Sequence, residues 1–129
     1  MKLLLDTHAV VWWWTDDPRI PAAARAAIAD PANIVYVSAV SAWEIATKNR
    51  SGKWPGVEQI VDDFSALLRK SRFQALPVSV DHARLAGTFD SPHRDPFDRM
   101  LMAQSTEEKA ALVSADTVFR GMGAELIWA

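Results

Sequence analysis

Short apolar runs alternate with longer, helix-like stretches along the whole chain. Runs rich in leucine, isoleucine and valine are typical of buried strands, which are usually about four to eight residues long. We therefore predict strands at residues 2–5, 34–38, 111–114 and 125–128. A weaker strand is predicted within residues 73–80, where Pro77 interrupts the pattern because proline has no backbone N–H to donate.

The stretches between these runs have helical spacing. In residues 57–72 the apolar side chains recur every three or four positions, which predicts one amphipathic helix. Further helices are predicted at residues 21–29, 41–50 and 96–109, the first and last with proline at the start. Strands that alternate with helices indicate the α/β class, with a mainly parallel sheet covered on both faces. Because no linker or repeat interrupts the pattern, we expect one domain over residues 1–129.

Composition narrows the chemistry that is open to the chain. It has no cysteine and three histidines, so a disulfide or thiolate site is excluded and a zinc site is not expected. Any metal would be a hard cation held by oxygen atoms. The apolar N-terminal run is interrupted by Asp6 and His8, which suits neither a secretory signal nor a membrane span. We therefore expect a cytoplasmic protein without a membrane segment.

The net charge of −2 argues mildly against a nucleic-acid partner, because phosphate binding usually requires a basic excess. Four carboxylates neutralised by a metal would, however, turn the charge of the remainder to +2. Basic residues also cluster locally, with Lys48, Arg50 and Lys53 in one group and Arg94 and Arg99 in another. The overall charge therefore does not decide the partner.

Four acidic residues are placed where a parallel sheet would bring them together. Asp6 directly follows the first predicted strand, and Asp116 lies just past a later one. Glu44 and Asp98 lie in the first turns of two predicted helices. In open α/β sheets, ligands bind outside the carboxyl ends of the strands, and helix N-termini point to the same edge. We therefore expect the four carboxylates to meet there.

Helix capping offers a simpler explanation for some of these acids. Ser41 and Glu44 have the spacing of a capping box, and Asp95 before Pro96 has the pattern of an N-cap. For Asp95 we favour capping. Glu44 and Asp98 have mainly apolar neighbours, and a lone buried carboxylate is costly unless it is paired or metal-bound. Asp6 and Asp116 could each be turn residues, but turns and caps explain all four acids less well than a shared site does.

Clustered carboxylates favour phosphoryl chemistry. Carboxylates a few ångströms apart repel one another and raise each other's pKa values. Mg²⁺ or Mn²⁺ relieves that repulsion, prefers oxygen ligands and keeps bound waters. Such ions activate water and stabilise the charge that develops on a phosphodiester. The acids therefore predict a metal-dependent nuclease.

The same residues belong to a set of motifs that resembles the PIN-domain ribonucleases, specifically the VapC-type toxins of bacterial toxin–antitoxin modules. The resemblance covers almost the whole chain, and the matching segments read, in order, LLDTHAVVWWW, VSAVSAWEIATKNRSGKW, HRDPFDRMLMAQS and LVSAD. It implies a PIN-like three-layer α/β/α fold. It also places the family's catalytic, metal-binding acids on Asp6, Glu44, Asp98 and Asp116.

The resemblance further implies a Mg²⁺- or Mn²⁺-dependent endoribonuclease that hydrolyses RNA through a metal-activated water. Such a protein acts as the toxin of a type II pair, is usually a homodimer and is inhibited by a cognate antitoxin. Asp95, Thr7 and Ser114 match positions that support the acids. The candidates for RNA contact are Arg94, Arg99 and Lys48, although solvated surface charge explains these three at least as well.

Other functions remain open on the sequence. A catalytically silent PIN-like interaction module would keep the fold without the chemistry. A Mg²⁺-dependent phosphatase of the haloacid-dehalogenase type would need an acid at position 8, where the chain has His8. A response-regulator receiver would need an acid beside Asp6, where the chain has Thr7. Within the nucleases, DNA is an alternative substrate. Among the tryptophans, we expect at least one of residues 12–14 at the surface and Trp54 as a second interface candidate.

Overall fold

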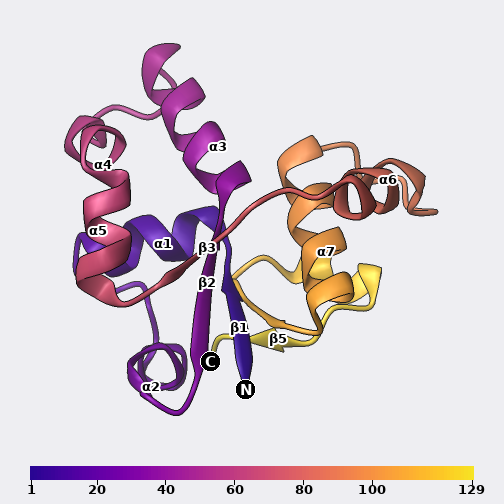
Figure 1. Cartoon of the computed structure of the whole chain (residues 1–129), viewed down its shortest axis with the longest axis horizontal. Coiled ribbons are helices and arrows are strands. Elements are labelled where there is room, and N and C mark those ends of the chain that lie inside the picture. The colour runs from indigo at the N-terminus through magenta and orange to yellow at the C-terminus, as the bar shows by residue number, and fades with distance from the viewer.

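The computed structural model describes residues 1–129 and has a five-stranded sheet at its centre. The strand order is β3-β2-β1-β4-β5, and every neighbouring pair is parallel. This confirms the predicted α/β class, with a sheet that is wholly parallel (Figure 1). The strands are β1 (Lys2–Leu5), β2 (Ile34–Ser38), β3 (Gln74–Leu76), β4 (Ala111–Val113) and β5 (Leu126–Ile127).

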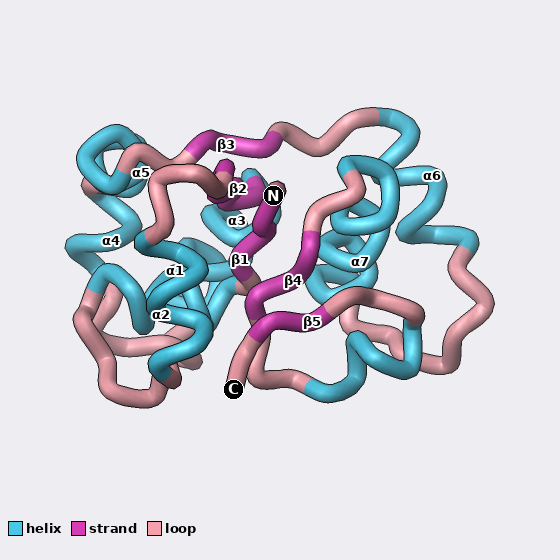
Figure 2. Tube along the Cα trace, turned by 90° about the horizontal axis from the view of Figure 1, so that it is seen from below, coloured by secondary structure: helices cyan, strands magenta, loops and turns pink.

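Helices cover the sheet on both sides (Figure 2). One side carries α1, α2, α4 and α5, and the other carries α6, α7 and the 3₁₀ helix η1, while α3 continues upward from β2 (Figures 1 and 2). The bounds are α1 (Thr7–Trp14), α2 (Ala22–Ala29), α3 (Ala39–Arg50), α4 (Glu58–Asp62), α5 (Phe64–Ser71), α6 (Val80–Thr88), α7 (Pro96–Glu108) and η1 (Thr117–Met122).

The alternation of side chains along β1 builds the two sides of the core. Leu3 and Leu5 pack into a cluster with residues of α1 and α2, whereas Leu4 packs with residues of α7 on the opposite face. Successive strand residues point to opposite faces, so a strand that is apolar throughout serves two cores at once. The three layers expected of the fold follow from this arrangement.

Two predicted helices differ from those observed. The predicted helix over residues 57–72 is interrupted at Asp63 and forms α4 and α5. The packing changes across the interruption, because Ile60 of α4 belongs to a small cluster with Val11 and Ile45, whereas α5 contacts that cluster and, through Leu68, the main core as well. The helix predicted over residues 21–29 begins at Ala22, so Pro21 is its N-cap rather than its first residue.

The third difference concerns the start of α3. This helix begins at Ala39, directly after β2, and Ser38 caps it by accepting a hydrogen bond from the Val40 N–H at 3.0 Å. Ser41 therefore lies inside the helix, which excludes the alternative of a capping box between Ser41 and Glu44. Glu44 lies in the second turn of α3, so its carboxylate does not cap the helix.

The tryptophans are spread over partly exposed positions. Residues 12–14 are all half-buried, and the Trp14 indole N–H donates to the Ser71 hydroxyl at 2.8 Å, which joins α1 to the end of α5. Trp54 is half-buried and stacks on His8, with ring centroids 4.8 Å apart. Trp43, with 62% of its surface exposed, is the most exposed aromatic side chain. None of the helices combines the length and the apolar character that crossing a membrane requires.

Candidate active site

Asp6 joins the end of β1 to the start of α1. Its Oδ1 accepts the Ala9 N–H at 2.7 Å and so caps α1, while its Oδ2 accepts the hydroxyl of Ser114, which follows β4. The Asp6 N–H donates to the Val113 carbonyl at 3.0 Å, which continues the pairing of β1 with β4. Only 9% of Asp6 is exposed. The carboxylate is therefore held in one orientation by two strands and a helix.

Asp116 is placed by the same serine. Its N–H donates to the Ser114 hydroxyl oxygen at 3.0 Å, and its Oδ1 caps η1 by accepting the Val118 N–H at 3.0 Å. Ser114 thus links Asp6 and Asp116, one buried and one exposed, across the end of β4. Its hydroxyl acts as a positioning group, which fits the supporting role expected for it.

Glu44 enters the site from α3, and 5% of its surface is exposed. Its partner is Lys48, one turn further along α3, whose ammonium forms an ion pair with Glu44 Oε2. The start of α3 is tied to α1 by the hydroxyls of Thr7 and Ser41, 3.0 Å apart. The buried carboxylate is therefore compensated by a lysine that is itself partly exposed to solvent.

Asp95 and Asp98 lie at the start of α7. Asp95 is the N-cap, and its Oδ1 accepts the N–H groups of Phe97 at 2.9 Å and Asp98 at 3.1 Å, which confirms the predicted capping role. The Asp98 Oδ2 lies 2.9 Å from Nε2 of His93, in the loop before the helix. The capping residue orients the first turn, so the second carboxylate can point away from the helix.

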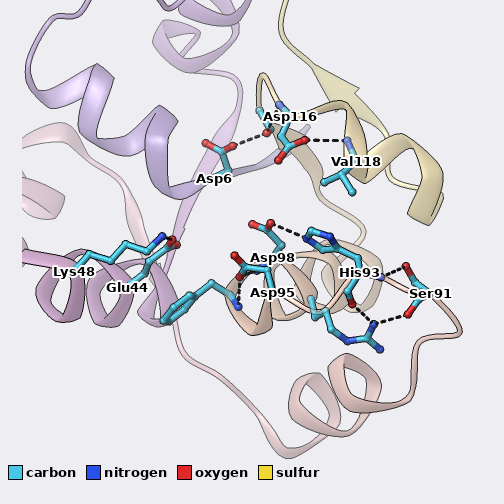
Figure 3. Close-up of polar contacts among 12 residues, drawn as sticks. Asp6, Glu44, Lys48, Ser91, His93, Asp95, Asp98, Asp116 and Val118 are labelled. Carbon is cyan, nitrogen blue, oxygen red and sulfur yellow. Dashed lines mark hydrogen bonds and ion pairs between the residues drawn. The ribbon is translucent and has the colours of Figure 1, made fainter. Parts of the chain in front are cut away.

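These elements enclose a polar cavity of about 210 Å³ at the carboxyl edge of the sheet. No apolar side chain lines it, and all four predicted acids do (Figure 3). Its walls are Asp6, Thr7, His8, Glu44, Lys48, Asp95, Asp98 and Asp116. We call this space the acid cavity.

Burial and like charge raise the pKa values of two carboxyls in the acid cavity. For Asp6 the largest cause is loss of hydration, opposed by the hydrogen bonds from Ser114 and Ala9 and by the nearby His8. For Asp98 the pKa is raised first by burial and then by the charges of Asp95 and Glu44, while His93 opposes the shift. A positive charge placed between the two carboxylates would stabilise the ionised form of each.

The acid cavity fits a hard divalent cation in its chemistry. Its donors are carboxylate oxygens, which Mg²⁺ and Mn²⁺ prefer, and the raised pKa values show that burial disfavours the ionised carboxylates, which a cation would stabilise. As the side chains lie, no three acidic or histidine groups could hold one ion together. Binding of one ion would therefore require these side chains to rearrange.

A comparison with protein-family models assigns the chain to a family. The family model described as the PIN domain matches residues 3–125, which is nearly all of it. The chain belongs to the PIN-domain family. The acid cavity lies entirely within the matched residues, and nucleases of this family generally use divalent metal ions.

Solved structures share the fold of this PIN domain. A chain of VapBC2 from Rickettsia felis, crystallised with a DNA fragment from its promoter, matches with a TM-score of 0.71 and 17% identity, over 98% of this chain and 97% of that one. A chain of VapBC-1 from nontypeable Haemophilus influenzae matches with a TM-score of 0.70 and 16% identity, over 98% and 96%. FitAcB from Neisseria gonorrhoeae matches with a TM-score of 0.58 and 16% identity, over 96% and 95%. Comparison with curated protein sequences finds no match.

Two histidines near the acids were not assigned to the site from the sequence. His8 lines the acid cavity of the PIN domain beside Asp6, and His93 contacts Asp98. The sequence shows that His93 and Asp98 belong to one motif, but it does not show that the loop between them folds back to bring the two side chains into contact. His8 follows Thr7 in the first turn of α1, where no sequence pattern distinguishes a cavity residue from a surface one.

The basic residues proposed for RNA contact lie in different surroundings. Lys48 lines the acid cavity, and Arg94 is exposed in the loop before α7. Arg99 is turned inward, with its guanidinium donating to the backbone carbonyls of Ala86, Phe89, Ser91 and His93 at 2.7–3.2 Å. The donors of Arg99 therefore hold the loop between α6 and α7, and its contact with RNA stays a prediction.

Proposed function

We propose that this PIN domain is a divalent-metal-dependent endoribonuclease and the toxin of a type II toxin–antitoxin pair. The observation that carries the proposal is the acid cavity, in which carboxylates from four separate elements line one polar space and two have raised pKa values. Buried like charges cost stability, so a chain that retains them gains from a cation when one is bound.

The proposed roles follow from the contacts of each side chain. Asp6, Glu44, Asp98 and Asp116 would hold the cation, and Ser114 and the Ala9 N–H keep Asp6 oriented toward the cavity. Asp95 supports Asp98 by capping α7. When bound, Mg²⁺ or Mn²⁺ supplies charge stabilisation for the phosphodiester and lowers the pKa of the attacking water. Lys48, released from Glu44, and Arg94 would contact the RNA backbone.

The antitoxin and the oligomer are proposed from the similar structures. The VapBC structures supply the analogy for a cognate antitoxin, and a homodimer is inferred from the resemblance of the sequence to VapC-type toxins. Exposed Trp43, whose ring packs edge-on against Phe97 with centroids 5.1 Å apart, offers aromatic surface beside the acid cavity for such a contact. A toxin of this kind would act in the cytoplasm.

A catalytically silent interaction module is the second candidate. It is favoured by the ion pair of Glu44 with Lys48 and by the contact of Asp98 with His93, which satisfy two carboxylates without any metal. If these contacts persisted in the presence of Mg²⁺ or Mn²⁺, the acids would be structural. A direct test of cleavage separates the two candidates.

The test is cleavage of total cellular RNA by the purified, antitoxin-free protein with Mg²⁺ or Mn²⁺. We expect cleavage by the wild type, none in EDTA, and a loss of about 100-fold or more in Asp98→Asn, since a ligand of a catalytic ion is removed. Asp81→Asn, the same substitution at an exposed position of α6, is the matched control and should cut normally.

Two results would count against this proposal in different ways. Wild-type protein that leaves RNA intact with either metal would favour the silent module. Asp98→Asn protein that cuts as fast as the wild type would place the active site elsewhere. Circular dichroism of each variant should confirm that it is folded, so that lost activity is not lost structure.

A further inference from the structure

A second cavity lies directly beside the acid cavity, on the far side of His93. Its volume is about 400 Å³, and it opens between the loop before α7 and the 3₁₀ helix η1. In Figure 3 His93 lies between Asp98 on one side and Ser91 on the other, with Val118 above it in the view. Its lining residues are Ser91, Pro92, His93, Val118, Gly121 and Met122. We call it the His93 cavity.

Both walls of the His93 cavity are joined to carboxylates of the acid cavity. On one wall, Nε2 of His93 contacts Asp98 Oδ2 at 2.9 Å. On the other, the N–H of Val118 donates to Asp116 Oδ1 at 3.0 Å. A molecule in the His93 cavity would therefore lie next to whatever the acid cavity holds.

The loop that forms the first wall is held in place by α7. Arg99 donates to the carbonyls of Ser91 at 3.2 Å and His93 at 2.9 Å, and the His93 N–H donates to the Ser91 hydroxyl at 3.3 Å. A binding surface that is held before the ligand arrives loses less conformational freedom on binding. The His93 cavity is therefore a preorganised feature.

The lining of the His93 cavity fits a flat heterocycle with a polar edge. Pro92, Val118 and Met122 offer apolar contact, and a methionine sulfur is a favourable neighbour of an aromatic ring. Ser91 offers a hydroxyl, and Nδ1 of His93 has no hydrogen-bond partner in the protein. No lysine or arginine lines the space, so it does not suit a phosphate group.

We propose that the His93 cavity binds the base of the nucleotide next to the phosphodiester that is cleaved, and that it sets a base preference at that position. This inference rests on the proposed ribonuclease function. Proteins that read single-stranded RNA commonly take an unstacked base into an aromatic or apolar site and contact its polar edge. Because the His93 cavity lies beside the acid cavity, a base bound there would place its phosphodiester next to the cation that the carboxylates would hold.

Gly121 allows the His93 cavity to be filled without touching the acids. A Cβ added at Gly121 would meet no atom within 4 Å, and the residue does not need a left-handed backbone. Gly121→Leu should therefore place a side chain in the cavity while the fold is kept. Gly87 of α6 meets the same two conditions at an exposed position, so Gly87→Leu is the matched control.

The first experiment compares the RNA fragments made by the wild type, Gly121→Leu and Gly87→Leu. We expect the wild type and Gly87→Leu to share one base preference beside the cut. Gly121→Leu should lose it, with kcat/KM for the preferred RNA lower by about tenfold, the scale of one lost base-stacking contact. Mn²⁺ affinity measured by calorimetry should stay unchanged in all three. Cleavage by Gly121→Leu with the wild-type preference and rate would overturn the inference.

The second experiment does not depend on cleavage. The methyl NMR signals of Met122 and Val118 are followed while each nucleoside 5′-monophosphate, and separately inorganic phosphate, is added to the metal-free wild type. Shifts with at least one nucleotide and none with phosphate support a base site, even if no RNA is cut or if Gly121→Leu does not fold. No nucleotide-specific shift overturns the inference, and would leave a protein partner as the better occupant.

Discussion

The two ends of α7 carry partly buried carboxylates in different surroundings. At its start, Asp98 contacts His93, but burial and then the like charges of Asp95 and Glu44 raise its pKa. Near its end, Glu108 faces a complementary partner, with Oε2 lying 3.0 Å from Nε2 of His82. Nδ1 of that same histidine accepts the N–H of Ser79, at the cap of α6, at 3.0 Å.

This difference separates groups that serve the fold from groups that serve chemistry. Both ring nitrogens of His82 have hydrogen-bond partners, and these contacts join α6 to α7. The side chain is buried, with 3% of the residue exposed. The carboxylates at the start of the helix gather like charge that protein groups only partly compensate. A buried polar network that is fully paired strengthens a fold, whereas unrelieved charge weakens it until a ligand arrives.

The largest expected effect is on the paired end of α7. His82→Ala removes the contact with Glu108 and the acceptor for Ser79, and it leaves a cavity in a buried position. We expect the free energy of unfolding to fall by about 3 kcal/mol, measured by urea denaturation. Mn²⁺ affinity of the folded variant should remain that of the wild type. A variant as stable as the wild type would mean that the network contributes little.

The next effect is at the acid cavity and concerns metal binding. At a free Mn²⁺ concentration about 100 times the dissociation constant, the wild type should gain about 2.7 kcal/mol of stability. His82→Ala should gain the same amount from its lower starting point. Asp98→Asn should gain much less, which thermal melts with and without Mn²⁺ would reveal. Equal gains in all three proteins would place the ion outside the acid cavity.

The smallest expected effect is the change in stability when the charge of Asp98 is removed in the absence of metal. In EDTA at neutral pH, Asp98→Asn should be more stable than the wild type by about 1 kcal/mol, because the variant has no buried charge at that position. Asp81→Asn, exposed on α6, should show no such gain.

The pH dependence of this gain tests its cause. The folded pKa of Asp98 is raised above the ordinary value of 3.8, so the unfolded chain releases its proton first as the pH rises. The advantage of Asp98→Asn should therefore be absent below about pH 3.8, grow as the pH rises through the folded pKa and be complete above it. An advantage that is constant across this range would have another origin.

The apolar runs were sufficient to predict most of the sheet. Residues 3–5 are all leucine because β1 is central and packs on both faces, and Asp6 ends that run abruptly. Asp95 before Pro96 likewise predicted the start of α7, since capping depends on residues close in sequence. Where neighbours along the chain determine structure, the pattern alone was enough.

The remaining differences depend on contacts between distant residues. The break at Asp63 coincides with a change in packing, because α5 contacts the main core through Leu68 as well as the small cluster against which α4 packs. Arg99 was indistinguishable from a surface cation until the loop between α6 and α7 presented its carbonyls. The pairing of Glu44 with Lys48 was foreseeable from their spacing on one helix face, but that spacing did not reveal whether the carboxylate was buried.

The bond between Ser114 and Asp6 has a consequence for synthesis of the protein. The two residues are 108 positions apart in the chain, yet their contact orients the first carboxylate of the acid cavity. While the ribosome makes the chain, Asp6 emerges early and waits for β4 and Ser114. A growing chain therefore carries an incomplete site until β4 and Ser114 have been made. If the protein is a toxin, its own messenger and ribosome are exposed to a finished active site only after Ser114 and Asp116 have been made.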